Sequence, residues 1–288
     1  MRTVRFKQVD VFTARPFLGN PVAVILDAQG LSDDEMARIA AWTNLSETTF
    51  VLPSARASYR LRIFTPRAEL PFAGHPTIGS AHAVREAGLC PADSPLVQEC
   101  TVGLIPLAVD KDGAIAARVP PARLTPFPHA AALGELLGTS VTDPRVVDMG
   151  PRWIVAGVGR VEVLRGLAPD LNAMADLDRR TDTTGVTVYA IDDDRGAASV
   201  ELRSFAPLHG IPEDPVCGSG NASVGAYLHA TGGLARFPDG RYLARQGAAV
   251  GRAGEIQVSV NASAGGDSPE IRIGGRAVTV IEGTIRLA

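Results

Sequence analysis

Hydrophobic and polar residues alternate in many short stretches of the chain, which is the pattern of strands with one buried face. Residues 4–12 alternate in this way, and residues 59–63 place Arg60 and Arg62 between apolar neighbours. Residues 21–26 are almost continuously apolar and predict a fully buried strand. Further strands are expected at 48–52, 146–149, 153–158, 161–164, 186–191, 200–205, 256–260, 271–273 and 278–281.

Helical patterns are few by comparison. Ser32 and Glu35 have the spacing of a capping box ahead of an apolar face, which predicts the start of a helix. A second helix is expected near residues 130–137. Because many short strands with few helices favour curled sheets or barrels, the sequence predicts an α+β fold.

Two further helices are predicted to begin directly after glycine-rich turns. The first follows Gly74, with Pro76 expected at the first helical position. The second, expected over residues 221–228, follows the run Gly218-Ser219-Gly220. The first N–H groups of a helix have no partner inside it and carry partial positive charge, so each start is a candidate anion site. We expect the two starts to face each other and hold one carboxylated substrate between them.

The two halves of the chain repeat three short patterns in the same order. Residues 19–24 resemble residues 150–155, residues 47–51 resemble residues 182–186, and a Phe-x-Pro triplet precedes each glycine-rich turn. Three matches in order indicate duplication of one αβ unit. Prolines crowd residues 120–128, where we expect the hinge between two domains.

Composition and charge exclude several functions. Hydrophobic residues make up 45% of the chain, charged residues 20%, and the net charge is −3, which predicts a globular protein that does not bind nucleic acid. No apolar run is long enough to span a bilayer, and the first residues lack the apolar block of a signal peptide. We therefore expect no membrane partner and a cytoplasmic location.

The histidines and cysteines show no pattern of a metal site or disulfide framework. Three cysteines and five histidines are widely spaced. His75 and His82 share one face of a predicted helix, but no third ligand is near them. We expect one histidine in the functional site, one packed histidine, and no bound metal.

Several segments resemble the signature motifs of the PhzF-like family of phenazine biosynthesis. They are residues 9–13, 44–50, 72–77, 213–219, 246–247 and 251–252. The resemblance implies a diaminopimelate-epimerase-like fold of two pseudo-symmetric domains, each a curled sheet around a central helix. The last strand would return to the first domain, which gives domains of residues 1–121 with 278–288 and of residues 122–277. The resemblance also implies a homodimeric isomerase that needs no cofactor.

By the same resemblance Glu47 is the acid/base, with His75, Asp214 and Ser219 around the substrate. Burial of Glu47 against apolar neighbours would raise its pKa and suit it to carry a proton between carbons. Local sequence by itself favours a solvated glutamate at a helix end. His75 would bind a substrate carboxylate, relay a proton, or only satisfy backbone groups. Asp214 would bind a substrate amine or hydroxyl, orient His75, or cap a helix.

The remaining candidates are expected to bind substrate. Cys217 has two readings, as a partner base of Glu47 or as a small packed cysteine. The matching segment of the first half, Gly74-His75-Pro76, has no cysteine, which argues against a racemase with two thiol bases. The predicted binding residues are Ser46, Gly74, Cys217, Gly218, Ser219 and Gly220.

These features predict an isomerase in which Glu47 moves a proton between carbons of a small, carboxylated, cyclic amino or hydroxy compound. Two alternatives stay open. One is an amino-acid epimerase or racemase, which inverts a stereocentre. The other is a catalytically idle protein of the same fold that binds a ligand or another protein.

Overall fold

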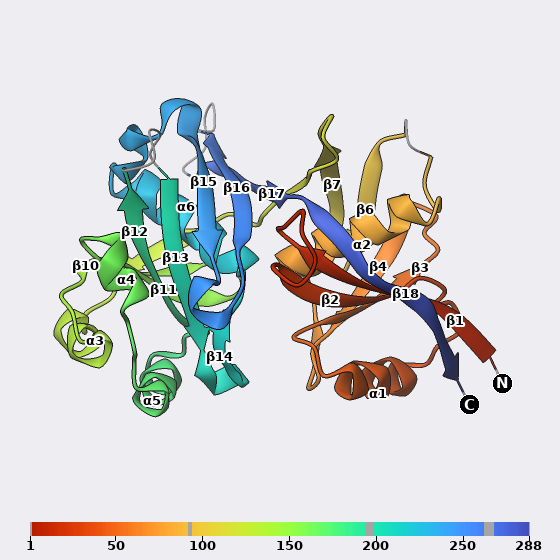
Figure 1. Cartoon of the computed structure of the whole chain (residues 1–288), viewed down its shortest axis with the longest axis horizontal. Helices are drawn as coiled ribbons and strands as arrows, with labels where there is room; N and C mark the ends of the chain where they lie inside the picture. Colours follow the sequence, from red (N-terminus) through yellow and green to blue (C-terminus); the bar gives the residue numbers. More distant parts are fainter. Residues whose placement is uncertain (1, 92–93, 194–198, 262–267, 288) are drawn as a thin grey trace. The chain divides into compact units, whose positions relative to one another are not determined.

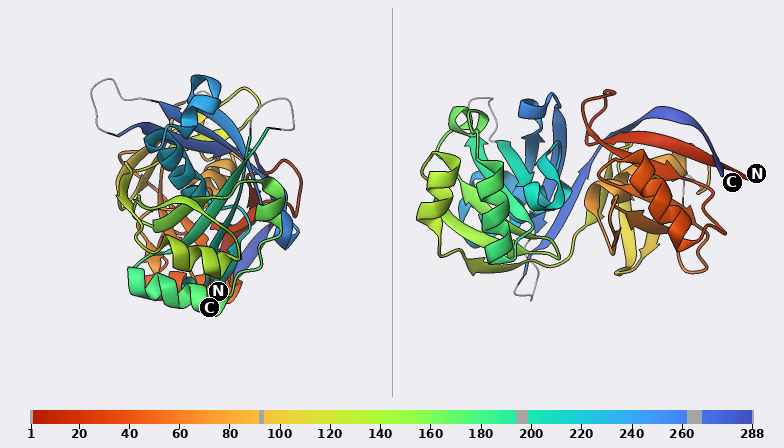
Figure 2. Two further views of the ribbon diagram at one scale, coloured as in Figure 1. Left: turned by 90° about the vertical axis from the view of Figure 1, so that its left-hand side faces the viewer. Right: turned by 90° about the horizontal axis from the view of Figure 1, so that it is seen from below.

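The computed structural model describes residues 2–91, 94–193, 199–261 and 268–287 of the chain. By internal contacts the chain divides into two compact units, residues 1–118 with 274–288 (unit 1) and residues 119–273 (unit 2). Each unit is a curled sheet with one helix running inside it, as Figure 1 and Figure 2 show. This is the α+β fold that the sequence predicts.

The C-terminal strand of the chain completes the sheet of unit 1. The last strand pairs antiparallel with the first, from Arg2 opposite Leu287 to Val11 opposite Ala277. The described elements of unit 1 are β1 (Arg2–Val11), β2 (Asn20–Ile25), α1 (Asp33–Thr43), β3 (Thr48–Leu52), β4 (Tyr59–Phe64), β5 (Glu69–Leu70), α2 (Gly74–Glu86), β6 (Leu96–Cys100), β7 (Gly103–Val109), β8 (Ile115–Arg118) and β18 (Ala277–Leu287).

Two parallel pairings interrupt an otherwise antiparallel sheet in unit 1. β2 pairs parallel with β3, and β4 pairs parallel with β6, while antiparallel pairings join β1 to β2 and β18, β4 to β3 and β5, and β7 to β6 and β8. A parallel pair needs a crossover, and α1 and α2 supply one each. Helix α1 lies on the outside of the sheet, where the capping box between Ser32 and Glu35 forms as predicted. Its buried residues Met36 and Ala40 pack with Val4, Ile25 and Phe50.

Helix α2 runs inside the curled sheet and is buried on nearly every side. Small residues make this possible because the strands approach its backbone closely. A Cβ atom on Gly79 would lie 2.5 Å from Cγ1 of Val22 and 2.8 Å from Cγ2 of Val11. The helix begins at Gly74, so Pro76 occupies its third position and not the first as expected. Its missing N–H still costs no bond there, because the first four N–H groups of a helix have no partner inside it.

Unit 2 repeats the same arrangement. Its elements are β9 (Arg123–Pro126), α3 (Ala130–Leu137), β10 (Thr142–Asp148), β11 (Arg152–Gly157), α4 (Val161–Arg165), α5 (Leu171–Thr181), β12 (Gly185–Asp192), β13 (Ser199–Ala206), η1 (Pro207–His209), β14 (Ile211–Asp214), α6 (Gly218–Ala230), η2 (Gly233–Arg236), η3 (Pro238–Gly240), β15 (Arg241–Gln246), η4 (Ala248–Val250) and β16 (Gly254–Asn261). Strand β17 (Glu270–Gly275) carries the chain back from unit 2 to unit 1.

The strand directions of unit 2 match those of unit 1. β11 pairs parallel with β12, as β2 does with β3, and β13 pairs parallel with β15, as β4 does with β6. Helix α6 takes the place of α2 and is likewise almost entirely buried. The match in order and direction supports the duplication that the repeated patterns indicate.

Residues 161–164 form part of helix α4, and the strand expected there is wrong. A strand would place the side chains of Val161 and Val163 on the same face. In the structure Val161 and Leu164 are buried, whereas Val163 is 37% exposed. A spacing of three between buried residues is the period of a helix. The helix of unit 2 that starts at Gly218 also begins earlier than the expected residue 221.

Within the described residues, no helix is both long enough and apolar enough to cross a membrane.

Candidate active site

Glu47 lies in the turn between α1 and β3 of unit 1. Helix α1 ends at Asn44, which adopts the left-handed conformation with φ of 53°. The N–H of Ala23 in β2 donates a hydrogen bond to the carbonyl oxygen of Glu47 at 3.3 Å. This bond fixes the backbone of Glu47 beside β2, and only 13% of its side chain is exposed.

The carboxyl of Glu47 faces the imidazole of His75. Oε2 of Glu47 lies 3.3 Å from Nε2 of His75, whose side chain is 6% exposed. Burial raises the pKa of Glu47 to about 7, and a hydrogen bond with Ser46 lowers it only in part. Glu47 is therefore not the solvated helix-end residue that local sequence favours. At neutral pH such a carboxyl populates both of its forms, so it can accept a proton and return it.

Asn20 sits on the other side of the His75 ring. Its Nδ2 lies 3.4 Å from Nδ1 of His75, and the Asn20 side chain is buried. With the amide as donor, Nδ1 accepts and the ring proton is on Nε2, where it faces the carboxyl of Glu47. This contact is compatible with the tautomer that carries the ring proton on Nε2.

The parallel pairing of β2 and β3 explains how these residues meet. Parallel strands start at the same edge of a sheet, and here Asn20 begins β2 while Glu47 directly precedes β3. Helix α2 begins at Gly74, so His75 lies in its first turn. Four predicted residues, Ser46, Glu47, Gly74 and His75, thus come together in unit 1. Asn20 was not predicted as a site residue, although a polar residue that opens an apolar strand is a usable signal.

In unit 2 the predicted residues cluster at the turn between β14 and α6. Asp214 ends β14, and its Oδ1 accepts a hydrogen bond from the N–H of Val216 at 3.0 Å. Asp214 therefore holds the turn and is not the residue that caps the helix. The capping residue is Cys217, whose Sγ accepts from the N–H of Gly220 at 3.2 Å.

Cys217 is fully enclosed in this turn. Burial and the nearby Asp214 carboxylate raise the pKa of its thiol well above the usual value. A thiol acts as a base or nucleophile only as thiolate, so this environment disfavours the role of a partner base. The geometry supports the reading of Cys217 as a small packed residue that caps α6.

Ser219 and Gly220 contribute a hydroxyl and a close backbone approach. The indole Nε1 of Trp153 donates to Oγ of Ser219 at 2.9 Å. A Cβ on Gly220 would lie 2.6 Å from Oγ of Ser204, so only glycine fits. Trp153 was not predicted for this turn, because it lies far from Ser219 in the sequence.

The two units differ at the residue directly before the strand that follows the first crossover, which is Glu47 before β3 in unit 1. The sequence patterns matched residues 47–51 with residues 182–186, which would set Asp182 against Glu47. In the structure Asp182 is the left-handed cap of α5, as Asn44 is of α1. The residue directly before β12 is Thr184, so Thr184 is the counterpart of Glu47.

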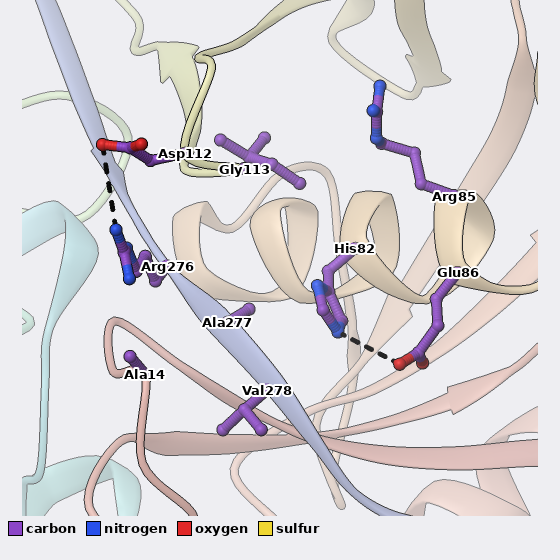
Figure 3. Close-up of a pocket in the computed structure, with 10 residues that line it drawn as sticks. Ala14, His82, Arg85, Glu86, Asp112, Gly113, Arg276, Ala277 and Val278 are labelled. Carbon is purple, nitrogen blue, oxygen red and sulfur yellow. Dashed lines mark ion pairs between the residues drawn. The ribbon is translucent and has the colours of Figure 1, made fainter. Parts of the chain in front are cut away.

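A separate depression of about 500 Å³ lies in unit 1 between the C-terminal half of α2, the turn before β8 and the start of β18. Figure 3 shows His82 and Glu86 projecting from α2 and Arg276 facing Asp112. Nε2 of His82 lies 3.9 Å from Oε1 of Glu86, and Arg276 forms an ion pair with Asp112. Burial lowers the pKa of His82. None of the predicted site residues lines this depression, so it is separate from the candidate site.

No group of three or more metal-ligating side chains occurs in the part of the chain that the structure describes.

Comparison with known proteins places these features in a family. Residues 9–283 match the family model for phenazine biosynthesis-like proteins, PhzC-PhzF. A crystal structure of a phenazine biosynthesis protein of the PhzF family from Bacillus anthracis superposes with a TM-score of 0.86 and 27% identity, covering 100% of both chains.

Two curated relatives are similar over most of their length. "Antisense-enhancing sequence 1" of Schizosaccharomyces pombe is 42% identical over 294 residues, which cover 96% of this chain and 97% of the relative. The trans-2,3-dihydro-3-hydroxyanthranilate isomerase of Pseudomonas aeruginosa is 35% identical over 232 residues, which cover 78% and 79%.

Proposed function

Because this chain belongs to the PhzC-PhzF family of phenazine biosynthesis-like proteins, we propose that it is an isomerase that works without a cofactor. It moves a proton between two carbons of a small, carboxylated, cyclic amino or hydroxy compound. Glu47 takes the proton from one carbon and returns it to another. The relative named as trans-2,3-dihydro-3-hydroxyanthranilate isomerase supports this substrate class, since that compound is a carboxylated ring with an amino and a hydroxyl group.

One observation carries the proposal: the carboxyl of Glu47 is buried, has a pKa of about 7, and lies 3.3 Å from His75. A base with a pKa near the working pH is ionised often enough to act and still basic enough to take a proton. General acid–base catalysis of this kind contributes about 10²–10⁴-fold in rate.

Removal of a proton from carbon leaves negative charge on the substrate, which the start of α2 is suited to stabilise. The first N–H groups of the helix and its dipole favour an anion. His75, with its proton on Nε2, adds a donor next to Glu47. Preorganised donors of this type contribute about 10²–10³-fold each.

We extend the proposal to the turn of unit 2. Asp214 and the hydroxyl of Ser219 are suited to bind an amino or hydroxyl group, and the start of α6, with Gly218 and Gly220, is suited to bind a carboxylate. Cys217 takes no part in the chemistry, because burial raises the pKa of its thiol and disfavours the reactive thiolate. A single carboxylate at the position of Glu47, with Thr184 in the other unit, favours proton transfer by one base over inversion by two.

The test uses trans-2,3-dihydro-3-hydroxyanthranilate as the probe substrate in deuterated water. The wild-type protein should isomerise it, with deuterium entering the product at the carbon that gains a proton. Glu47→Gln should lower turnover by about 10²–10⁴-fold and leave ligand binding in place. Glu135→Gln, on the exposed face of α3, is the matched control and should act as the wild type does.

The outcomes separate the alternatives. Inversion of a stereocentre without a shift of the double bonds would identify an epimerase. Binding of the probe without exchange of any carbon-bound proton would identify an idle ligand-binding protein. Full turnover by Glu47→Gln, with deuterium in the product, would refute the role of Glu47.

A further inference from the structure

Gln246, the last residue of β15, makes three hydrogen bonds to the turn between β14 and α6. Its Oε1 accepts from the N–H of Cys217 at 3.0 Å and from Nδ2 of Asn221 at 3.0 Å. Its Nε2 donates to the carbonyl oxygen of Asp214 at 2.8 Å. The side chain is only 4% exposed, so these bonds are shielded from water.

The three partners lie on both sides of the turn. Asp214 is the last residue before it, Cys217 is the cap of α6, and Asn221 lies in the first turn of that helix. Asn221 also donates to the carbonyl oxygen of Cys217 at 2.8 Å. One amide therefore ties the residue that enters the turn to the helix that leaves it. Buried backbone groups need such partners, and the Gln246 side chain supplies them to the Asp214 carbonyl and the Cys217 N–H.

The next residue, Gly247, packs against the same turn. Its φ is +100°, and a Cβ there would lie 2.5 Å from the carbonyl oxygen of Pro215. The parallel pairing of β15 with β13, Leu202 opposite Gln246, sets where this contact falls. The end of β15 is thus built to hold residues 214–217 from one side.

We propose that Gln246 is a positioning residue that holds the carboxyl of Asp214 and the N–H groups at the start of α6 in the geometry that binds substrate. This inference rests on the proposed function, in which that turn binds substrate. An amide suits the position because it is donor and acceptor at once. A methionine offers neither group, and an ionised glutamate would set an oxygen against the Asp214 carbonyl.

A protonated glutamate, in contrast, reproduces the amide pattern. Its O–H can donate to the Asp214 carbonyl while its other oxygen accepts from Cys217 and Asn221. Gln246→Glu should therefore regain the wild-type geometry when acid neutralises it. Each segment packed against Gln246 carries titratable or charged side chains: Asp214 and Cys217 in the turn, Glu201 and Arg203 in β13, Glu255 in β16, and Arg252 ahead of β16. Loss of packing alone would give no such recovery with pH.

The deciding experiment is hydrogen exchange of the peptide covering residues 214–221 in the free protein, each variant compared with wild type at the same pH. At pH 8 we expect at least about tenfold faster exchange in both Gln246→Met and Gln246→Glu, the size of one lost hydrogen bond of about 1.4 kcal/mol. At pH 6 Gln246→Glu should approach the wild-type rate, and Gln246→Met should not. Gln257→Glu, at an exposed position of β16, is the control.

Kinetics with the probe substrate then test the positioning role. At pH 8 both variants should raise KM by about tenfold or more with a smaller fall in kcat, and Gln246→Glu should recover KM at pH 6. Wild-type exchange at residues 214–221 in both variants would overturn the inference, and so would faster exchange with no change in KM. An inactive wild type would refute the proposed substrate, while the exchange result would still decide whether Gln246 holds the turn.

Discussion

Nε2 of His75 lies 3.3 Å from Oε2 of Glu47, and both side chains are largely buried. Burial separates the carboxyl of Glu47 from water and so disfavours its charged form, which raises its pKa to about 7. Glu47 therefore changes its protonation within the range in which most enzymes work.

The first prediction concerns the pH dependence of catalysis. As the base in the free enzyme, Glu47 must be ionised, so kcat/KM should rise about tenfold per pH unit below an apparent pKa of about 7 and level off above it. The measurement is kcat/KM for the probe substrate between pH 5 and 9. A rising limb centred near 4.5, the ordinary value for a glutamate, would show that burial does not tune this group.

The second prediction concerns stability. The folded-state pKa of Glu47 is raised, so the folded protein binds the proton more tightly than the unfolded chain does, and stability falls as pH rises from 4.5 to about 7. Glu47→Gln removes this loss and should be more stable than wild type at pH 8, by up to about 3 kcal/mol. The gain should shrink toward pH 5. Urea unfolding at both pH values measures it, and an equal difference at the two would contradict the raised pKa.

The third prediction concerns the contact between Asn20 and His75. Asn20→Leu removes the donor to Nδ1 and frees the ring to change tautomer, so kcat should fall about tenfold or more, less than in Glu47→Gln. The ¹⁵N chemical shifts of the His75 ring should show Nε2–H in the wild type and a mixture in the variant. Asn172→Leu, at an exposed position of α5, is the control. An unchanged ring spectrum would rule out the tautomer role.

The fourth prediction separates a cap from a base at Cys217. Cys217→Ser keeps an acceptor for the N–H of Gly220 and should retain activity within a few-fold. Cys217→Val loses the acceptor and should cost about 1 kcal/mol of stability. In native protein, iodoacetamide should modify the half-buried Cys90 well before Cys217. Loss of turnover in a stable Cys217→Ser protein would restore the thiol as a catalytic candidate.

The fifth prediction concerns the close packing of α2. Gly79→Ala places a methyl group 2.5 Å from Val22 and 2.8 Å from Val11, so overpacking of about 1–3 kcal/mol should outweigh the gain of about 1 kcal/mol in helix propensity. Thermal unfolding measures the difference. Gly159→Ala, where a Cβ meets nothing within 4 Å, should change stability little. Equal stability of both variants would show that the strands around α2 can accommodate a methyl group at Gly79.

Much of the fold could be predicted because its signals are local. The capping box of α1 depends on Ser32 and Glu35, three residues apart, and the predicted helix at 130–137 matches α3. Helix α4 was missed because residues 161–164 are too few for their apolar pattern to distinguish a strand from one turn of a helix. The assignment of residues 1–121 with 278–288 to one domain, and of 122–277 to the other, stays a prediction, as do the homodimer and the cytoplasmic location.

By itself, the sequence determined the two small-residue helix starts, the repeated pattern of strands and helices, and the family motif that carries Glu47, because backbone conformation and the period of burial are properties of neighbours along the chain. Tertiary structure alone decided that Asn20 and Glu47 flank the His75 ring, that Cys217 caps α6, and that Gln246 ties Asp214 to Cys217. Strand pairing fixes those contacts between residues far apart in sequence. The pKa of Glu47 is likewise set by burial, which no local pattern records.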